Sequence, residues 1–167
     1  MRVIGIDPGL TRTGYGVVEV RGGISKMLAV GTIRAEAGEP VERSLFRICV
    51  TLERVMEEHE PEAMAVERLF VNKNTSTALK VGQASGVALL AAAEIGIPVR
   101  QYTPSEVKSA ITGVGNADKD QVAFMVKAML RIEHELDSAD AADALALALT
   151  HAHASKFSEK IKEAEAR

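Results

Sequence analysis

Three apolar segments that lie far apart in the chain each adjoin acidic residues, and this arrangement constrains the fold more than any other feature. The first segment, residues 2–7, ends at Asp7 and runs into a Pro-Gly turn. The second, residues 63–67, ends at Glu67, and the third, residues 137–143, contains Asp140 and Asp143 and opens a long Ala/Leu helical pattern. A fold that brings these segments together creates a cluster of carboxylates, which at neutral pH requires bound protons or divalent cations.

Hydrophobic periodicity predicts an α/β fold. Runs rich in β-branched residues indicate strands, and apolar residues at helical spacing indicate helices. The expected strands are residues 3–7, 14–20, 24–33, 63–67 and 97–102, and the expected helices are residues 40–59, 75–95, 104–110, 118–130 and 138–154. A double glycine at residues 22–23 indicates a hairpin between the second and third strands. Three antiparallel strands followed by alternating helices and strands predict a mixed five-stranded sheet flanked by helices.

The chain of 167 residues is expected to form a single domain. No linker, repeat or low-complexity segment divides residues 1–156, and the charged residues 157–167 are expected to form a disordered tail. Gly82 and Gly86, in the helix expected at 75–95, would allow another helix or backbone segment to pack closely against it.

The expected topology indicates where the acids meet. In an open α/β sheet, sites form at the carboxyl ends of strands, and Asp7 and Glu67 both lie at such ends. Asp140 and Asp143 are three residues apart and therefore share one helix face. Asp137 precedes the apolar pattern and suits a helix N-cap, so it is assigned a structural role. Taken singly, Asp7 is also explained as a turn residue and Asp140 as a helix-start residue.

The ligand types favour magnesium or manganese. Carboxylate oxygens without a cluster of thiolates or imidazoles select Mg²⁺ or Mn²⁺ rather than Zn²⁺. His151 and His153 are two residues apart and point to different helix faces, so they make a poor metal pair. Two hard cations roughly 4 Å apart can activate water and stabilise the leaving oxygen in phosphodiester cleavage.

Composition limits the environment and the partners. The single cysteine, Cys49, excludes an internal disulfide, and no apolar run is long enough to cross a bilayer, so a cytoplasmic protein is expected. The net charge of −3 argues weakly against a nucleic-acid partner. Residues 68–131, however, contain eight Lys/Arg and four Asp/Glu. A basic middle beside a carboxylate cluster would suit a phosphodiester, although the charge counts alone favour a solvated helical surface.

Four segments resemble the RuvC family of bacterial Holliday-junction resolvases. They are residues 3–9 (VIGIDPG), 65–67 (AVE), 78–84 (ALKVGQA) and 140–146 (DAADALA). The resemblance extends, in order and at family-like spacing, from residue 1 to about residue 153. It implies a ribonuclease-H-like fold, a homodimer, Mg²⁺-dependent cleavage of four-way DNA junctions and a complex with a branch-migration helicase.

The resemblance also implies roles for individual residues. Asp7, Glu67, Asp140 and Asp143 match the four metal-binding catalytic acids of the family. Lys108 and Lys119 match basic residues near the scissile phosphate. Phe70 matches an aromatic residue associated with bases near the crossover. Phe70, Lys73, Lys80, Lys108 and Lys119 are accordingly expected to contact DNA.

Three other functions share some of these features. An ATPase of the actin/Hsp70 type has a similar strand-ending Asp-x-Gly start, but 167 residues leave no room for the second lobe that closes over a nucleotide. A non-catalytic binder of DNA structures would not need an intact set of four acids. A related nuclease that acts on RNA differs only in its substrate.

Overall fold

The computed structural model describes the backbone of residues 1–68 and 75–165 and the side chains of residues 1–68 and 75–155. Its centre is a mixed sheet of five strands in the order β3-β2-β1-β4-β5. The strands are β1 (Arg2–Asp7), β2 (Arg12–Arg21), β3 (Ile24–Arg34), β4 (Ala63–Glu67) and β5 (Val99–Tyr102). The first three are antiparallel, whereas β4 pairs parallel with β1 and β5 pairs parallel with β4. This confirms the predicted sheet.

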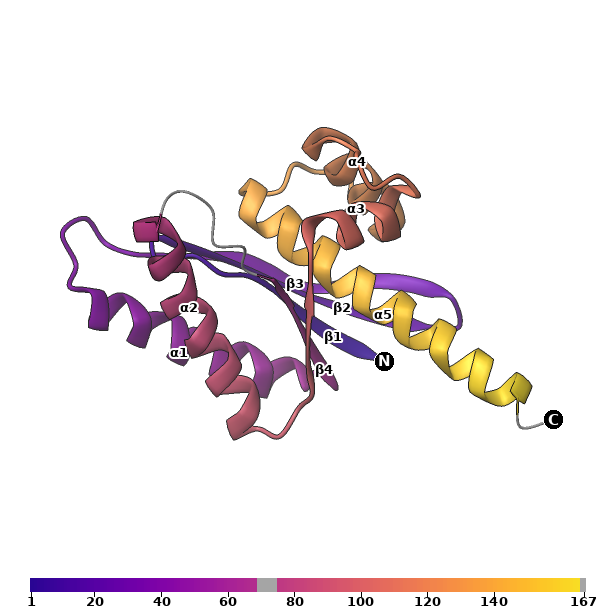
Figure 1. Cartoon of the computed structure of the whole chain (residues 1–167), viewed down its shortest axis with the longest axis horizontal. Coiled ribbons are helices and arrows are strands. Elements are labelled where there is room, and N and C mark those ends of the chain that lie inside the picture. The colour runs from indigo at the N-terminus through magenta and orange to yellow at the C-terminus, as the bar shows by residue number, and fades with distance from the viewer. Residues whose placement is uncertain (69–74, 166–167) are drawn as a thin grey trace.

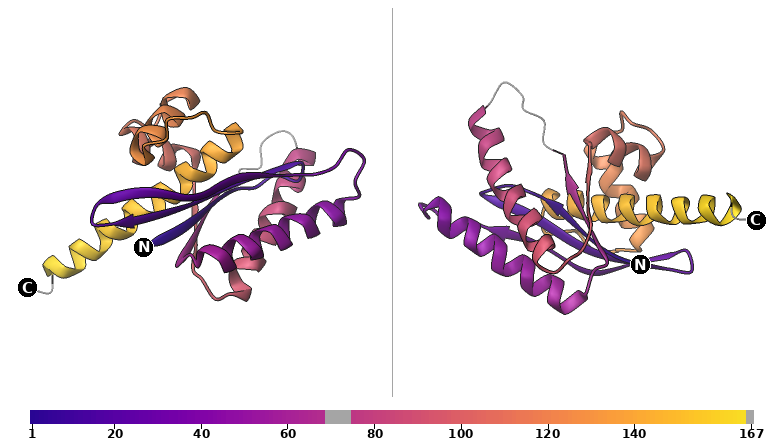
Figure 2. Two further views of the ribbon diagram at one scale, coloured as in Figure 1. Left: turned by 180° about the vertical axis from the view of Figure 1, so that it is seen from behind. Right: turned by 60° about the horizontal axis from the view of Figure 1, so that its bottom comes forward.

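Helices cover both faces of the sheet (Figure 1). The helices are α1 (Val41–His59), α2 (Thr75–Glu94), α3 (Pro104–Thr112), α4 (Lys119–Leu130) and α5 (Ala139–Glu165). In Figure 2 the pair α1 and α2 lies on one face, and α5 crosses the other face with α3 and α4 stacked on its first half. Among the described residues, no helix is both long and apolar enough to span a bilayer.

Two hydrophobic cores follow from the alternation of side chains along the strands. Ile4 and Ile6 of β1 face α1 and α2, where Leu52 of α1 is fully buried and α2 contributes mainly alanines. Val3 faces the other core, which is filled from α3, α4 and α5. Because alanine side chains are short, α2 packs closely without using glycine. The close packing predicted at Gly86 is wrong for the described chain, since a Cβ added there would meet no atom within 4 Å.

Side-chain caps fix where the site-bearing helices begin. Thr103 caps α3 and Asp118 caps α4, each through a reciprocal pair of hydrogen bonds with the third helical residue. At α5 the cap is Ser138, whose Oγ accepts a hydrogen bond from the backbone N–H of Ala141 at 3.1 Å. The assignment of Asp137 as this cap is therefore wrong by one residue. The Ser138 hydroxyl also contacts Thr32 Oγ1, which ties the start of α5 to β3.

The last helix is longer than predicted. It begins at Ala139, close to the expected start, but continues to Glu165 instead of ending near Ala154. Residues 155–165 contain neither glycine nor proline and are rich in Lys and Glu, which are strong helix formers, so nothing in the local sequence ends the helix. The domain limit at residue 156 and the disordered tail stay predictions.

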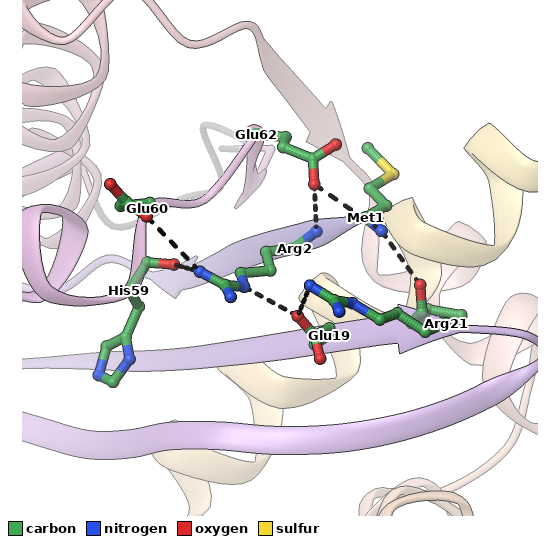
Figure 3. Close-up of polar contacts among 8 residues, drawn as sticks. Met1, Arg2, Glu19, Arg21, His59, Glu60 and Glu62 are labelled. Atoms are coloured by element: carbon green, nitrogen blue, oxygen red, sulfur yellow. Dashed lines mark hydrogen bonds and ion pairs between the residues drawn. The ribbon is translucent and has the colours of Figure 1, made fainter.

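Ion pairs hold the amino-terminal end of β1, which is the end of the strand opposite Asp7. Figure 3 shows the Arg2 guanidinium between Glu19 of β2 and the carboxyl end of α1. Its Nε lies 2.9 Å from Glu19 Oε1, and its Nη1 donates to the His59 carbonyl oxygen at 3.0 Å. These contacts raise the pKa of Arg2 and lower the pKa of Glu19. They connect β1, β2 and α1 at the end of the sheet opposite the acids.

Candidate active site

A cavity of about 80 Å³ lies at the carboxyl ends of β1 and β4. Five of the nine described residues that line it are charged, and all five were predicted as site residues. They come from β1, β4, α3, α4 and α5 in turn: Asp7, Glu67, Lys108, Lys119 and Asp143. The apolar part of the wall is Pro104, Val107, Val122 and Leu147. The cavity thus joins residues up to 140 positions apart in the chain.

The parallel pairing of β1 and β4 places Asp7 beside Glu67. Ile6 pairs with Val66 in this register, and each acid is the next residue and the last of its strand. Both carboxylates therefore leave the sheet at the same edge. This confirms the predicted neighbourhood of the two strand-ending acids.

Helix α5 reaches the same edge because glycines let it approach the sheet closely. A Cβ at Gly14, the β2 residue that pairs with Asp7, would overlap the Asp140 carbonyl oxygen. A Cβ at Gly5 would likewise overlap the Ala144 carbonyl oxygen. The first turns of α5 consequently lie directly over β1 and β2, which brings Asp140 and Asp143 toward Asp7.

The two acids of α5 have different surroundings. Asp143 lines the cavity, and its Oδ2 lies 3.1 Å from Lys119 Nζ. Asp140 does not line the cavity, and its Oδ2 lies 3.2 Å from Arg12 Nε. The structure therefore brings three of the four predicted acids into one cavity and places the fourth beside it, paired with an arginine.

Burial and neighbouring acids raise the pKa values of Asp7 and Glu67. The pKa of Asp7 rises to about 7, mainly because burial penalises its charged form and further because of Glu67, Asp143 and Asp140, while Lys119 opposes the shift. The pKa of Glu67 is also raised, by burial first and by Asp143 second. A buried carboxylate such as Asp7, with a pKa of about 7 beside other acids, favours a bound cation, because the cation removes the repulsion.

The two lysines enter the cavity from neighbouring helices. Lys119 is the first residue of α4, directly after its cap, and Lys108 lies on α3. The hydrogen bond to Asp143 is the main reason that the pKa of Lys119 is raised, so this lysine stays charged beside the acids. The cavity therefore holds both signs of charge, as a site that binds a cation and a phosphate needs.

The donor atoms suit a hard divalent cation. Among the described residues that line the cavity, the side chains that offer metal-binding oxygens are the carboxylates of Asp7, Glu67 and Asp143, and none is a thiolate or an imidazole. Across the described residues, however, no three Asp, Glu, His or Cys side chains stand in a ready metal-binding arrangement. In this arrangement Lys119 pairs with one oxygen of Asp143, and Arg12 pairs with one oxygen of Asp140.

Of the other three predicted DNA contacts, the structure describes one. Phe70 and Lys73 fall outside the described residues. Lys80 is exposed on α2, away from the wall of the cavity. Arg12 was not predicted as a site residue. The only feature of the sequence that could have indicated it is its position after the turn that follows Asp7.

A larger hollow of about 670 Å³ lies between the end of α3 and α4. The exposed Val114 and Phe124 line it together with Asp118 and Asp120. None of the four predicted acids lines this hollow. The smaller cavity is therefore the better candidate for catalysis, because it combines buried carboxylates with lysines.

Comparisons with known proteins agree with this site. The family model of crossover junction endodeoxyribonuclease RuvC matches residues 3–151. The chain is 48% identical over 167 residues to the crossover junction endodeoxyribonuclease RuvC of Moorella thermoacetica, with 100% of both chains covered. It is 45% identical to the corresponding protein of Brevibacillus brevis over 157 residues, which are 94% of this chain and 95% of that one.

A solved structure is similar over nearly the whole chain. It is RuvC of Thermus thermophilus in complex with a Holliday junction substrate, which is 40% identical, with a TM-score of 0.90 over 95% of this chain and 96% of that chain. This likeness confirms the ribonuclease-H-like fold.

Proposed function

This chain belongs to the RuvC family of crossover junction endodeoxyribonucleases, and from that premise we infer that it resolves four-way (Holliday) DNA junctions by hydrolysing phosphodiesters in two strands. It is an endodeoxyribonuclease that acts in recombination and repair. The observation that carries this function is the cavity in which Asp7, Glu67 and Asp143 lie with Lys108 and Lys119. The junction bound to the Thermus thermophilus protein supports the choice of substrate.

The four acids hold the metal in this proposal. Mg²⁺, with Mn²⁺ as a possible substitute, would supply positive charge and lower the pKa of water for attack on the phosphodiester. Asp7 and Glu67 present their carboxylates from fixed strand ends, so they provide the rigid half of the ligand set. Asp143 and Asp140 complete the set from α5. The products are a 5′-phosphate and a 3′-hydroxyl.

Lys119 and Lys108 act on the substrate phosphate. Both line the cavity, and their charges oppose the negative charge that builds on the phosphoryl oxygens in the transition state. Lys119 reaches this position from a capped helix start, so its backbone is fixed before the substrate binds. Val107, Val122 and Leu147 form the apolar part of the wall beside these charged groups.

A homodimer would cut two strands of a twofold junction. One face of α2 supports this assembly, because Leu79, Gly86 and Leu90 lie on the same side of the helix at spacings of seven and four residues. The side chains of Leu79 and Leu90 are 66% and 56% exposed, which is unusual for leucines on one helix face and is typical of a surface that another chain covers. A complex with a branch-migration helicase and a location in the cytoplasm remain predictions.

The Asp7→Asn variant tests the function. It should bind a labelled four-way junction as the wild type does, but should not cut it in Mg²⁺. Linear duplex and RNA–DNA hybrid serve as controls for the wild type, which should leave both largely uncut. Normal cleavage by the variant would refute the assigned acid, preference for the hybrid would favour an RNA-directed nuclease, and binding without any wild-type cleavage would favour a non-catalytic DNA-structure binder.

A further inference from the structure

Arg12 forms an ion pair with Asp140 at the rim of the cavity. Its Nε lies 3.2 Å from Asp140 Oδ2, across the contact between the start of β2 and the first turn of α5. The Arg12 side chain is 56% exposed, whereas that of Asp140 is 24% exposed. The arginine thus contacts a partly buried acid while it remains accessible to a large ligand such as DNA.

The backbone around Arg12 is fixed by its neighbours. Thr13 is fully buried, and its hydroxyl donates to the Gly9 carbonyl oxygen at 2.7 Å. The Ala35 N–H donates to the Thr11 carbonyl oxygen at 3.0 Å on the other side. Arg12 therefore projects from a rigid turn that also positions Asp7, five residues earlier.

The ion pairs divide the four acids into two classes. Asp143 is paired with Lys119 and Asp140 with Arg12, and both of these acids come from α5. Within residues 1–68 and 75–155, no cation forms an ion pair with Asp7 or Glu67. The two α5 acids thus have protein cations as partners in the metal-free state, and a metal that recruits all four acids meets both of these cations as competitors.

We propose that Arg12 competes with the divalent cation for Asp140 and, once displaced, contacts a phosphate of the bound nucleic acid. The guanidinium group suits both tasks, since its planar set of donors binds carboxylates and phosphates in the same manner. Displacing Arg12 from Asp140 costs little free energy, because an exposed ion pair changes an equilibrium constant by a factor of only about 1.5 to 5. Arg12 is a positioning residue for Asp140 before the metal binds. The phosphate contact rests on the proposed function, whereas the competition for Asp140 does not.

Metal binding without DNA tests the competition. The Arg12→Gln variant should reach half of its Mg²⁺-induced thermal stabilisation at a Mg²⁺ concentration about two- to fivefold lower than the wild type, because the competing cation is gone. Arg21→Gln is the matched control. Arg21 is also an exposed arginine of β2 in an ion pair, 3.0 Å from Glu19 Oε1, but it lies at the far end of the strand (Figure 3). This control should keep the wild-type midpoint.

Junction binding in Ca²⁺ tests the phosphate contact, with intact strands verified on a denaturing gel. Arg12→Gln should bind a labelled four-way junction about two- to tenfold more weakly, and the slope of log K against log salt should fall by about one. An unchanged Mg²⁺ midpoint or an unchanged junction affinity overturns the proposal. If Arg12→Gln lowers the melting temperature but leaves the Mg²⁺ midpoint and the junction affinity at wild-type level, the ion pair is purely structural and the proposal is also overturned. Failure of the proposed function looks different: the wild type would bind Mg²⁺ but leave the junction uncut.

Discussion

Lys119 Nζ lies 3.1 Å from Asp143 Oδ2, so a cation from the start of α4 holds a carboxylate from α5 across the wall of the cavity. The lysine is 77% exposed and the acid is 35% exposed, which makes the pair too accessible to contribute much to folding. Its position beside Asp7 and Glu67, whose charges also raise the pKa of Lys119, indicates a role in the reaction instead.

We expect Lys119→Met to lower the cleavage rate by about 100-fold or more, since a preorganised cation at the reacting phosphate contributes on this scale. Junction affinity should fall much less. Lys127→Met is the matched control, because Lys127 is also on α4 and pairs with Glu135 at 2.7 Å, a pair outside the cavity. Single-turnover cleavage of a labelled junction measures the effect. Equal rates for the two variants would contradict the assignment of Lys119.

The titration of Asp7 should lower the stability of the metal-free protein as the pH rises from about 4 to about 7. The folded-state pKa of Asp7 is about 7 and its ordinary value is 3.8, so within this window the folded state binds more protons than the unfolded state. At about 1.4 kcal/mol per pKa unit, this one group can account for a loss of at most about 4 kcal/mol. Glu67 shifts in the same direction and adds to the trend.

Asp7→Asn should therefore stabilise the metal-free protein at pH 8 by roughly 1–3 kcal/mol, because the amide carries no charge at any pH. At pH 4 the variant and the wild type should differ little. Urea unfolding in EDTA at the two pH values measures both differences. Glu62→Gln controls for a general effect of charge, because Glu62 is an exposed acid that directly precedes β4 and lies far from the cavity, beside the chain's amino group. A variant that is less stable than the wild type at pH 8 would contradict the pKa assigned to Asp7.

The main features of the site could be predicted because they depend on regular geometry. Strand ends place Asp7 beside Glu67 in any parallel pair, and helical spacing places Asp140 beside Asp143. What could not be predicted is which cation holds which acid. The Lys119–Asp143 contact joins residues 24 positions apart and depends on how α4 packs against α5. No local sequence pattern predicts that packing.

Two predictions were wrong for different reasons: one chose between neighbouring residues of similar propensity, and the other relied on residue type alone. Asp137 and Ser138 are both good N-caps, and the choice depends on the hydrogen bond of Ser138 to Ala141 and its contact with Thr32 of β3. Gly86 suggested close packing by its type alone, but it faces away from the sheet. Tertiary contacts made the difference in each case.

Leu90→Glu should disrupt the proposed dimer. A carboxylate on the exposed face of α2 would be buried against a second copy, which should raise the dimer dissociation constant at least tenfold, or about 1.4 kcal/mol. Ile24→Glu is the control, since Ile24 is 63% exposed on the β2–β3 hairpin. Sedimentation equilibrium over a range of concentrations measures the constant. A wild type that stays monomeric, or a variant that dimerises equally well, would refute this interface.

Gly5→Ala tests how closely α5 must approach the sheet. The added Cβ would overlap the Ala144 carbonyl oxygen and lie 2.7 Å from the Ala148 backbone nitrogen, and backbone atoms of a buried helix cannot move aside separately. The whole helix must shift, so we expect a loss of about 3 kcal/mol of unfolding free energy, at the upper end of the range for overpacked cores. The same shift would carry Asp140 and Asp143 away from Asp7.

Gly86→Ala is the matched control, because its Cβ would meet no atom and alanine favours a helix over glycine by about 0.5–1 kcal/mol. Both substitutions are best made in the Leu90→Glu background, so that self-association does not enter the measurement. Urea unfolding should then change in opposite directions for the two glycines. If Gly5→Ala is tolerated as well as Gly86→Ala, α5 can sit farther from β1, and the position of its acids must be set by the Ser138 contact with Thr32 instead.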